Sequence, residues 1–180
     1  MDVHDLRSLR PLSIIVMGVS GSGKSTLAKA LAAAAGCPFL EGDEYHSPES
    51  VQKMRAGTAL TDDDRWPWLE RLGRAIATAV TEHGIAVASC SSLKRIYRDR
   101  LRATIAVPVC FVLLEASRDE LTRRMTHRAG HYMPVTLLDS QLATLERPGA
   151  DELAITIDAS LPVEIACRQI ADGLTTHNSK

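Results

Sequence analysis

The sequence is poor in aromatic residues and nearly balanced in charge. Phe, Trp and Tyr together make up 4% of the 180 residues, and the formal net charge at pH 7 is −1. The balanced charge gives no reason to expect a nucleic acid or a membrane surface as a partner. The scarcity of aromatic rings leaves few flat surfaces on which a nucleobase could stack.

Long apolar runs and closely spaced cysteines are also absent. Residues 1–12 lack the apolar core of a signal peptide, and no apolar run approaches the length of a membrane span. The four cysteines are far apart, and Cys90 and Cys110 lie in apolar runs typical of strands. We therefore expect buried, reduced thiols, rather than disulfides or a metal site, in a cytoplasmic protein.

Short apolar runs alternate with helical patterns along the chain, which is typical of crossover units and a parallel sheet. The predicted strands cover residues 13–17, 38–41, 85–90, 108–114 and 154–158. The length favours one domain, residues 1–180, of the α/β class. We expect residues 1–12 and 175–180 to be flexible, because unanchored termini fray.

Three helix starts are marked by side chains that can cap a first turn. Ser47 precedes Pro48, which suits an N-cap followed by a first-turn proline. Thr61 begins the acidic run T-D-D-D, and Ser117 lies three residues before Glu120, the spacing of a capping box. Helices are therefore expected to begin directly after residues 47, 61 and 117.

The run G-V-S-G-S-G-K-S at residues 18–25 follows an apolar strand pattern and precedes a helical one. This order matches the phosphate-binding loop G-x-x-x-x-G-K-[ST]. Its glycines permit turns that direct backbone N–H groups toward phosphate oxygens. Lys24 brings a charge to the β- and γ-phosphates, and Ser25 offers a hydroxyl to Mg²⁺. We predict that ATP and Mg²⁺ bind here, with contacts from Gly18, Ser20, Gly21, Ser22, Gly23, Lys24, Ser25 and Thr26.

Polar side chains follow the second predicted strand, at Glu41, Asp43 and His46. In an open parallel sheet, ligands bind at the carboxyl ends of the strands. Asp43 is placed to accept a proton from an attacking hydroxyl, the general-base role that a kinase needs. Glu41 is a candidate for holding the water shell of Mg²⁺. The alternative is that these acids only solvate a loop.

Lys94 and Arg98 follow the third predicted strand, four residues apart on one side of a predicted helix. Such a cationic pair can hold a carboxylate or the transferring phosphoryl group. The alternative is an ordinary surface pair with Asp99 as its counter-ion.

A glycine and a proline interrupt the helical patterns in the segment 127–134, as expected of a mobile flap. Arg124 and Arg128 would swing over the phosphates when such a flap closes, where they would exclude water and neutralise charge in the transition state. We predict nucleotide contacts from Arg124 and a catalytic role for Arg128.

Several longer blocks together resemble one family, the gluconokinases, which are phosphate-loop kinases related to shikimate and adenylate kinases. Besides the phosphate loop, these blocks are G-D-E-Y-H-S-P-E-S-V-Q-K-M-R-A-G-T-A-L-T-D-D-D-R-W-P-W-L at 42–69, C-S-S-L-K-R-I-Y-R-D-R-L-R at 90–102, G-H-Y-M-P at 130–134 and S-Q-L-A-T-L-E-R-P-G-A-D-E at 140–152. The resemblance extends from about residue 13 to about residue 172.

The resemblance implies ATP-dependent phosphorylation of D-gluconate at its 6-hydroxyl. It also implies a P-loop NTPase three-layer sandwich with a five-stranded parallel sheet, a mobile lid like that of nucleoside monophosphate kinases, and a homodimer. Asp43 would be the acceptor-side base. The residues expected to grip the sugar acid are Asp43, His46, Lys53, Arg65, Lys94, Arg98 and His131. The chain departs from the pattern at Glu41, where relatives usually have aspartate, and at Ser47, which separates His46 from Pro48.

Two other functions fit parts of the pattern. One is a kinase of the same fold that acts on shikimate, a related sugar acid or a nucleoside monophosphate. The other is a nucleotide-binding switch without an acceptor, although the N-K-x-D and D-x-x-G runs of GTPases are absent. Trp66 and Trp68 are expected to pack against the core or a partner subunit rather than on a nucleobase.

Overall fold

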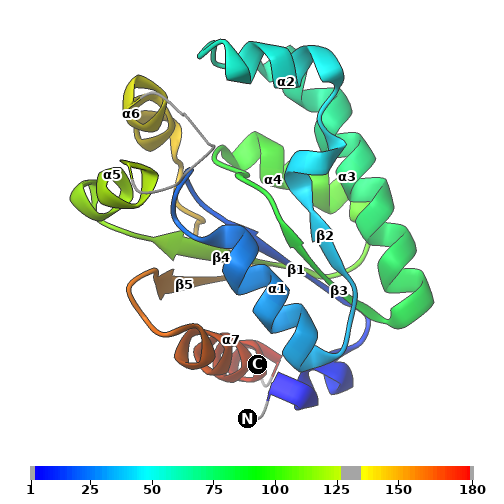
Figure 1. The fold of residues 1–180 in the computed structure, drawn as a ribbon. Helices are drawn as coiled ribbons and strands as arrows, with labels where there is room; N and C mark the ends of the chain where they lie inside the picture. The colour runs from blue at the N-terminus through cyan, green and yellow to red at the C-terminus, as the bar shows by residue number, and fades with distance from the viewer. Residues whose placement is uncertain (1–2, 127–134, 179–180) are drawn as a thin grey trace.

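The computed structural model describes residues 3–126 and 135–178, which form a parallel five-stranded sheet between two layers of helices (Figure 1). The strand order is β2-β3-β1-β4-β5, and every neighbouring pair is parallel. The strands are β1 (Leu12–Met17), β2 (Phe39–Glu41), β3 (Ile85–Ser89), β4 (Val109–Glu115) and β5 (Ala154–Asp158). All five predicted strands are confirmed to within one or two residues at their ends.

Helices connect the strands and cover both faces of the sheet. They are α1 (Lys24–Ala35), α2 (Pro48–Arg55), α3 (Asp62–His83), α4 (Arg95–Ile105), α5 (Arg118–Thr126), α6 (Val135–Thr144) and α7 (Val163–Asn178), with short 3₁₀-helices η1 (Val3–Leu9) and η2 (Gly42–Tyr45). Across the described ranges, no helix combines the length and the apolar character needed to cross a bilayer. The strands and crossovers bear out the predicted phosphate-loop kinase fold.

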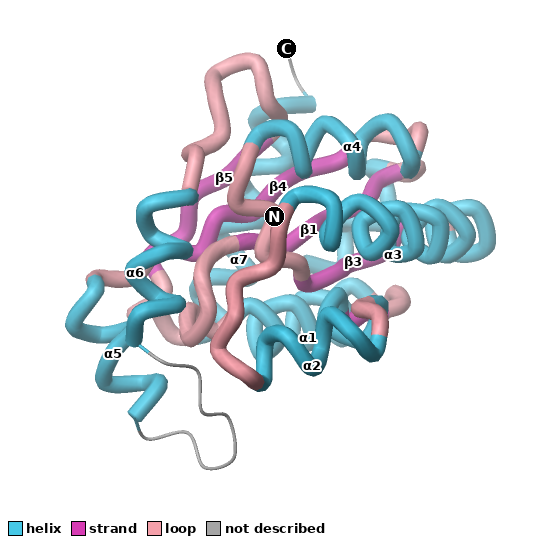
Figure 2. The backbone as a smooth tube through the Cα atoms, turned by 90° about the horizontal axis from the view of Figure 1, so that it is seen from above, coloured by secondary structure: helices cyan, strands magenta, loops and turns pink. Residues whose placement is uncertain are grey.

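The central strand β1 is buried on both faces, because its side chains alternate between two separate cores. Ile14 and Val16 pack with α1 and α7, whereas Ile15 and Met17 pack with α3 and α4. Viewed from above, the strands lie between α1 on one side and α4 on the other (Figure 2). A strand covered on both sides is expected to consist of consecutive apolar residues, as residues 14–17 do.

The predicted N-caps are confirmed at all three helix starts. The Ser47 hydroxyl accepts a hydrogen bond from the backbone N–H of Ser50, and Thr61 and Asp64 form a reciprocal capping box. The Ser117 hydroxyl accepts from the backbone N–H of Glu120 at 3.2 Å. Each cap satisfies amide groups that the first helical turn leaves without backbone partners.

The described residues near both ends of the chain pack against other elements or continue a helix. Val3 and Leu6 are buried in the core beside α1, and the Arg7 guanidinium donates to the carbonyls of Ala35 at 2.9 Å and Gly36 at 2.7 Å. Helix α7 continues to Asn178. The flexibility expected of residues 1–12 and 175–180 stays a prediction.

The cysteines are free thiols, as predicted. Cys90 and Cys110 are buried, and burial raises the pKa of each, to about 11 for Cys90 and about 12 for Cys110. A thiol with a raised pKa is a weak nucleophile, so these residues act as small apolar side chains of the core.

Strand β2 approaches β3 most closely at Gly42, the residue that follows β2. A Cβ atom at Gly42 would lie 2.1 Å from the carbonyl oxygen of Ser89, which belongs to the backbone and cannot rotate away. On the other side, the indole N–H of Trp68 donates to the Gly42 carbonyl at 2.7 Å. These contacts fix the backbone from which Asp43 projects.

Replacing Gly42 by alanine should push β2 away from β3 and shift Asp43. Overpacking of this kind typically lowers the free energy of unfolding by about 1–3 kcal/mol. Urea denaturation of the Gly42→Ala variant measures this loss. A midpoint equal to that of the unsubstituted protein would contradict the role assigned to this close approach.

Candidate active site

A cleft of about 1080 Å³ opens at the carboxyl ends of the strands. Residues predicted to bind phosphate line it together with both predicted acids. They include Ser20, Gly21, Ser22, Gly23, Lys24, Ser25, Thr26, Glu41, Asp43 and Arg124. Parts of the chain far apart in sequence thus meet in one cleft, as expected for an open parallel sheet.

The phosphate loop connects β1 to α1 in backbone conformations that glycine favours. Gly23 is the N-cap of α1 with φ of 97°, and Gly18 has φ of 139°. A Cβ atom on Gly18 would also lie 2.8 Å from the backbone carbonyl oxygen of Leu114. No side chain in the described ranges caps the first turn of α1, so its amides and its positive dipole end face the cleft.

Two side chains form hydrogen bonds with the backbone of the phosphate loop, one from the loop itself and one from helix α6. The Lys24 ammonium donates to the Val19 carbonyl at 2.9 Å. The side-chain carbonyl of Gln141 accepts from the backbone N–H of Ser20 at 2.7 Å. No chemical pattern in the sequence singles out Gln141, because its partner lies 121 residues away along the chain.

Arg124 lies between the phosphate loop and the segment that follows β5. Its guanidinium donates to the carbonyls of Ser22 at 3.2 Å and Ala159 at 2.8 Å, while Glu120 accepts from its Nε at 2.6 Å. Residues 158–161 line the same cleft. This position agrees with the predicted nucleotide contact of Arg124.

Glu41 and Asp43 flank the point where β2 ends. The Ser89 hydroxyl donates to the Glu41 carboxylate, and the backbone N–H of Gly42 donates to the Ser89 hydroxyl at 3.3 Å. The side chain of Asp43 is exposed to the cleft. Burial is the largest cause that raises the pKa of the Cys90 thiol, and smaller charge effects come from Asp43, which raises it, and Lys24, which lowers it.

A second polar group, beyond the residues that line the cleft, combines Lys94, Asp62, Tyr97 and Arg65. The Asp62 carboxylate accepts from the Lys94 ammonium at 2.9 Å and from the Tyr97 hydroxyl, and Arg65 lies 3.8 Å from the same carboxylate. Both cations also lie over the Tyr97 ring, at 5.4 Å for Arg65 and 5.5 Å for Lys94. The hydrogen bond from Tyr97, followed by that from Lys94, lowers the pKa of Asp62, and the bond to Asp62 raises the pKa of Lys94.

We call these four residues the cationic wall. Two of them were predicted as substrate-binding residues, and two were not. Lys94 and Arg65 were expected to bind substrate, whereas Asp62 was predicted only as a helix start and Tyr97 was not singled out. The spacing of Tyr97 three residues after Lys94 is a signal that could have suggested their contact.

His46 stacks on Trp68, with ring centroids 4.0 Å apart and an angle of 19° between the rings. Burial, aided by the charges of Arg65 and Arg71 and opposed by Asp43, lowers the pKa of His46 to about 4. The imidazole is therefore neutral at pH 7. Its Nδ1 is buried and has no hydrogen-bond partner within the described residues.

The structure corrects the prediction that Arg98 grips the substrate. Its side chain is fully buried and forms an ion pair with Glu152, at 2.7 Å between Nε and Oε2. Asp99, the suggested counter-ion, pairs with Arg102 and Arg95 instead. Lys94 lies at the N-cap of α4, outside the helix proper, so the two cations do not share a helix face.

Of the remaining predicted residues, Lys53 forms an ion pair with Asp64 at 2.7 Å that ties α2 to the start of α3. This bond is the largest cause that lowers the pKa of Asp64, to about 2. A substrate contact from Lys53 stays a prediction. Arg128 and His131 lie outside the described residues.

Trp66 and Trp68 pack within the protein. Trp68 is 2% exposed in the core with α3 and α4, and Trp66 meets the Tyr97 ring edge-on, with centroids 5.7 Å apart. The expectation that these rings pack rather than stack on a nucleobase is confirmed for Trp68 by its burial.

The fold, the phosphate loop at the start of α1 and the acid after the neighbouring strand define a phosphate-loop kinase. The family described as an AAA domain matches residues 14–148. The chain belongs to the gluconokinase family: it is 44% identical over 171 residues to the gluconokinase of Gluconobacter oxydans (strain 621H), over 94% of this chain and 96% of that relative.

Other relatives agree with this assignment. The thermosensitive gluconokinase of Escherichia coli (strain K12) is 45% identical over 78% of this chain and 74% of its own length. The crystal structure of a gluconokinase from Sinorhizobium meliloti 1021 aligns with a TM-score of 0.82 at 47% identity, over 92% of this chain and 93% of that one. A shikimate kinase from Acinetobacter baumannii, at 14% identity and a TM-score of 0.61, shares the fold alone.

The low pKa of His46 should make stability depend on pH. The unfolded chain binds a proton near pH 6.5, whereas the folded protein resists it until about pH 4, so stability is full above pH 6.5 and falls as the pH drops toward 4. The slope is at most about 1.4 kcal/mol per pH unit for one proton, and solvent near the half-buried ring makes it smaller.

Urea denaturation of the His46→Gln variant at several pH values tests this dependence. The variant should show a shallower fall between pH 6.5 and 4 than the unsubstituted protein. His83→Gln, at a solvent-exposed histidine, serves as the matched control and should keep the original slope. Parallel profiles for the unsubstituted protein and His46→Gln would rule out the assignment.

Proposed function

We propose that this protein transfers the γ-phosphoryl group of ATP to the 6-hydroxyl of D-gluconate, releasing ADP. The observation that carries the proposal is the cleft that brings Asp43 beside the phosphate loop, with the cationic wall close to His46. Among small hydroxy acids we choose D-gluconate as the acceptor because the chain belongs to the gluconokinase family.

The nucleotide side of the reaction uses positioning and charge. The amides at the start of α1 bind the phosphate oxygens, and Lys24 moves from the Val19 carbonyl to the phosphates, where its charge offsets the charge of the transition state. Arg124, already between Ser22 and Ala159, contacts the nucleotide from the opposite wall. Holding the two substrates in line is the main catalytic contribution expected of such a site.

The acceptor side supplies a base, cations and uncharged polar groups. Asp43 accepts the proton of the 6-hydroxyl while the hydroxyl oxygen attacks the γ-phosphorus of ATP. Lys94 and Arg65 bind the gluconate carboxylate, and neutral His46 forms a hydrogen bond with a hydroxyl through its Nε2. Gluconate has one carboxylate end and a chain of hydroxyls, which match the cations and the uncharged polar groups respectively.

The donor set beside the phosphate loop fits Mg²⁺, which prefers hard oxygen ligands. Ser25 and Glu41 line the same cleft, and the bond from Ser89 orients the Glu41 carboxylate. A bound Mg²⁺ would neutralise phosphate charge. The longer side chain of Glu41, compared with the aspartate usual in relatives, suits a contact through a water of the ion.

The homodimer implied by the resemblance and the cytoplasmic location expected from the cysteine pattern stay predictions. Light scattering of the purified protein measures the first directly.

A panel of acceptors tests the function. ADP release should depend on D-gluconate and be much slower with shikimate or with no acceptor. ATP hydrolysis that is indifferent to gluconate would indicate a nucleotide switch, and faster turnover with shikimate or another sugar acid would replace gluconate as the substrate.

The Asp43→Asn variant tests the base. It should bind ATP normally while kcat falls by about 10²-fold or more, because a general base contributes a factor of this size. Steady-state kinetics with both substrates, together with ATP titration, separates the two effects. Turnover close to that of the unsubstituted protein would exclude Asp43 as the base.

A further inference from the structure

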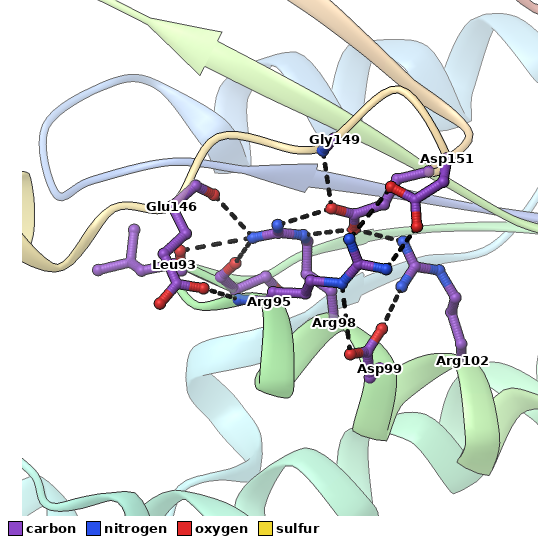
Figure 3. A network of polar contacts seen from close by, with 10 residues as sticks. Leu93, Arg95, Arg98, Asp99, Arg102, Glu146, Gly149 and Asp151 are labelled. Atoms are coloured by element: carbon purple, nitrogen blue, oxygen red, sulfur yellow. Dashed lines mark hydrogen bonds and ion pairs between the residues drawn. The ribbon is translucent and has the colours of Figure 1, made fainter.

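Arg98 lies in a network of polar contacts (Figure 3). Arg98 and Glu152, which form a buried ion pair, are not among the residues that line the cleft and take no part in the proposed chemistry. The contact is bidentate, at 2.7 Å from Nε and 2.8 Å from Nη2, and both side chains are almost completely buried. The bond from Arg98 is the first cause that lowers the pKa of Glu152 to about 2, and Gly149 and Arg102 also donate to this carboxylate. Both side chains are therefore charged, and the Glu152 carboxylate accepts hydrogen bonds from Arg98, Arg102 and the backbone of Gly149.

Charge pairing alone does not explain the choice of arginine. A buried ion pair is often no more stabilising than two apolar side chains of similar volume. Arg98 differs from a lysine because its Nη1 donates to three backbone carbonyls, of Ser92 at 3.3 Å, Leu93 at 3.4 Å and Glu146 at 2.9 Å. Only the planar guanidinium can reach these carbonyls and the carboxylate at once.

Two of these three carbonyls, those of Ser92 and Leu93, belong to the connection between β3 and α4, residues 90–94, which we call the acceptor loop. Ser92 has φ of 45°, in the left-handed region that a residue with a side chain rarely adopts. The Ser91 carbonyl accepts from the backbone N–H of Gly18 at 3.3 Å, and Lys94 is the last residue of the loop. This loop therefore connects the phosphate loop to a cation of the cationic wall.

A second tie fixes the same loop to the residues after α6. The backbone N–H of Glu146 donates to the Leu93 carbonyl at 2.8 Å, and the Glu146 carboxylate accepts from the backbone N–H of Arg95 at 2.6 Å. Figure 3 shows the Arg98 guanidinium between these residues and the turn that holds Gly149. Arg98 therefore adds a further tie, at Ser92 and Leu93, to a loop that is also bonded to the phosphate loop and to Glu146.

We propose that Arg98 is a positioning residue, which holds the carbonyls of Ser92 and Leu93 so that the Lys94 ammonium lies at a fixed place relative to the phosphate loop. Arg98 does not touch the acceptor and acts on acceptor affinity through Lys94. The inference rests on the proposed function, in which Lys94 binds the gluconate carboxylate.

The first test is the Arg98→Lys variant, which keeps the charge but loses the bonds to the carbonyls. The KM for gluconate should rise at least tenfold, while the KM for ATP stays within about twofold. Arg7→Ala is the matched control, since Arg7 caps the far end of α1 and its loss lowers stability away from the acceptor loop. It should leave the KM for gluconate unchanged at a comparable loss of stability.

A second variant guards against poor folding of Arg98→Lys. The double substitution Arg98→Met with Glu152→Met removes both charges together, so the core can remain stable. If this variant unfolds at the same urea concentration as the unsubstituted protein and yet has a raised KM for gluconate, positioning is supported. A normal KM for gluconate in the folded variant overturns the proposal.

A double-mutant cycle identifies the residue through which Arg98 acts. Lys94→Gln should itself raise the KM for gluconate, and adding Arg98→Lys should then have little further effect. If Lys94→Gln has no effect, the assignment of Lys94 in the proposed function fails. If Lys94→Gln has an effect and the two effects multiply, Lys94 binds the acceptor but positioning by Arg98 is wrong.

Discussion

The conformation of residues 18–25 is the constraint on which the rest of the site depends. Backbone amides bind an anion only if the chain turns so that consecutive N–H groups point the same way, and here glycine at positive φ provides those turns. The neighbouring elements fit closely around this loop: the Leu114 carbonyl leaves no room for a Cβ atom on Gly18, and Gln141 binds the Ser20 amide. The loop is shaped by its packing before any phosphate arrives.

The acceptor side follows a different principle, because its cations are already partly neutralised. Asp62 pairs with Lys94 and contacts Arg65, so an incoming carboxylate meets a group whose charges are balanced rather than a bare positive patch. In the proposed function, competition with Asp62 makes acceptor binding weaker but more selective, since an anion must also offer hydroxyls to groups such as His46 to gain enough contact energy. A simple inorganic anion cannot do so.

The sequence predicted the fold and located the phosphate loop because both depend on local patterns. Apolar runs located all five strands, and the spacing of glycines, Lys24 and Ser25 identified the phosphate loop. The acceptor side was harder to predict, since it depends on contacts between distant segments. Arg98 has the same charge and nearly the same position in sequence as Lys94, but its partner Glu152 is 54 residues away, and no local pattern reveals that pairing. For the same reason Asp62 was recognised as a helix start but not as the partner of Lys94.

The connection between β3 and α4 explains how one short segment can serve both substrates. Ser91 contacts the first glycine of the phosphate loop, and three residues later Lys94 enters the cationic wall. Phosphoryl transfer requires the two substrates to be aligned within a fraction of an ångström, so a loop that spans both sites must not vary in length or shape. A buried guanidinium bonded to successive carbonyls of that loop provides such rigidity, because shifting both of these carbonyls away would deprive a charged donor of acceptors in the core.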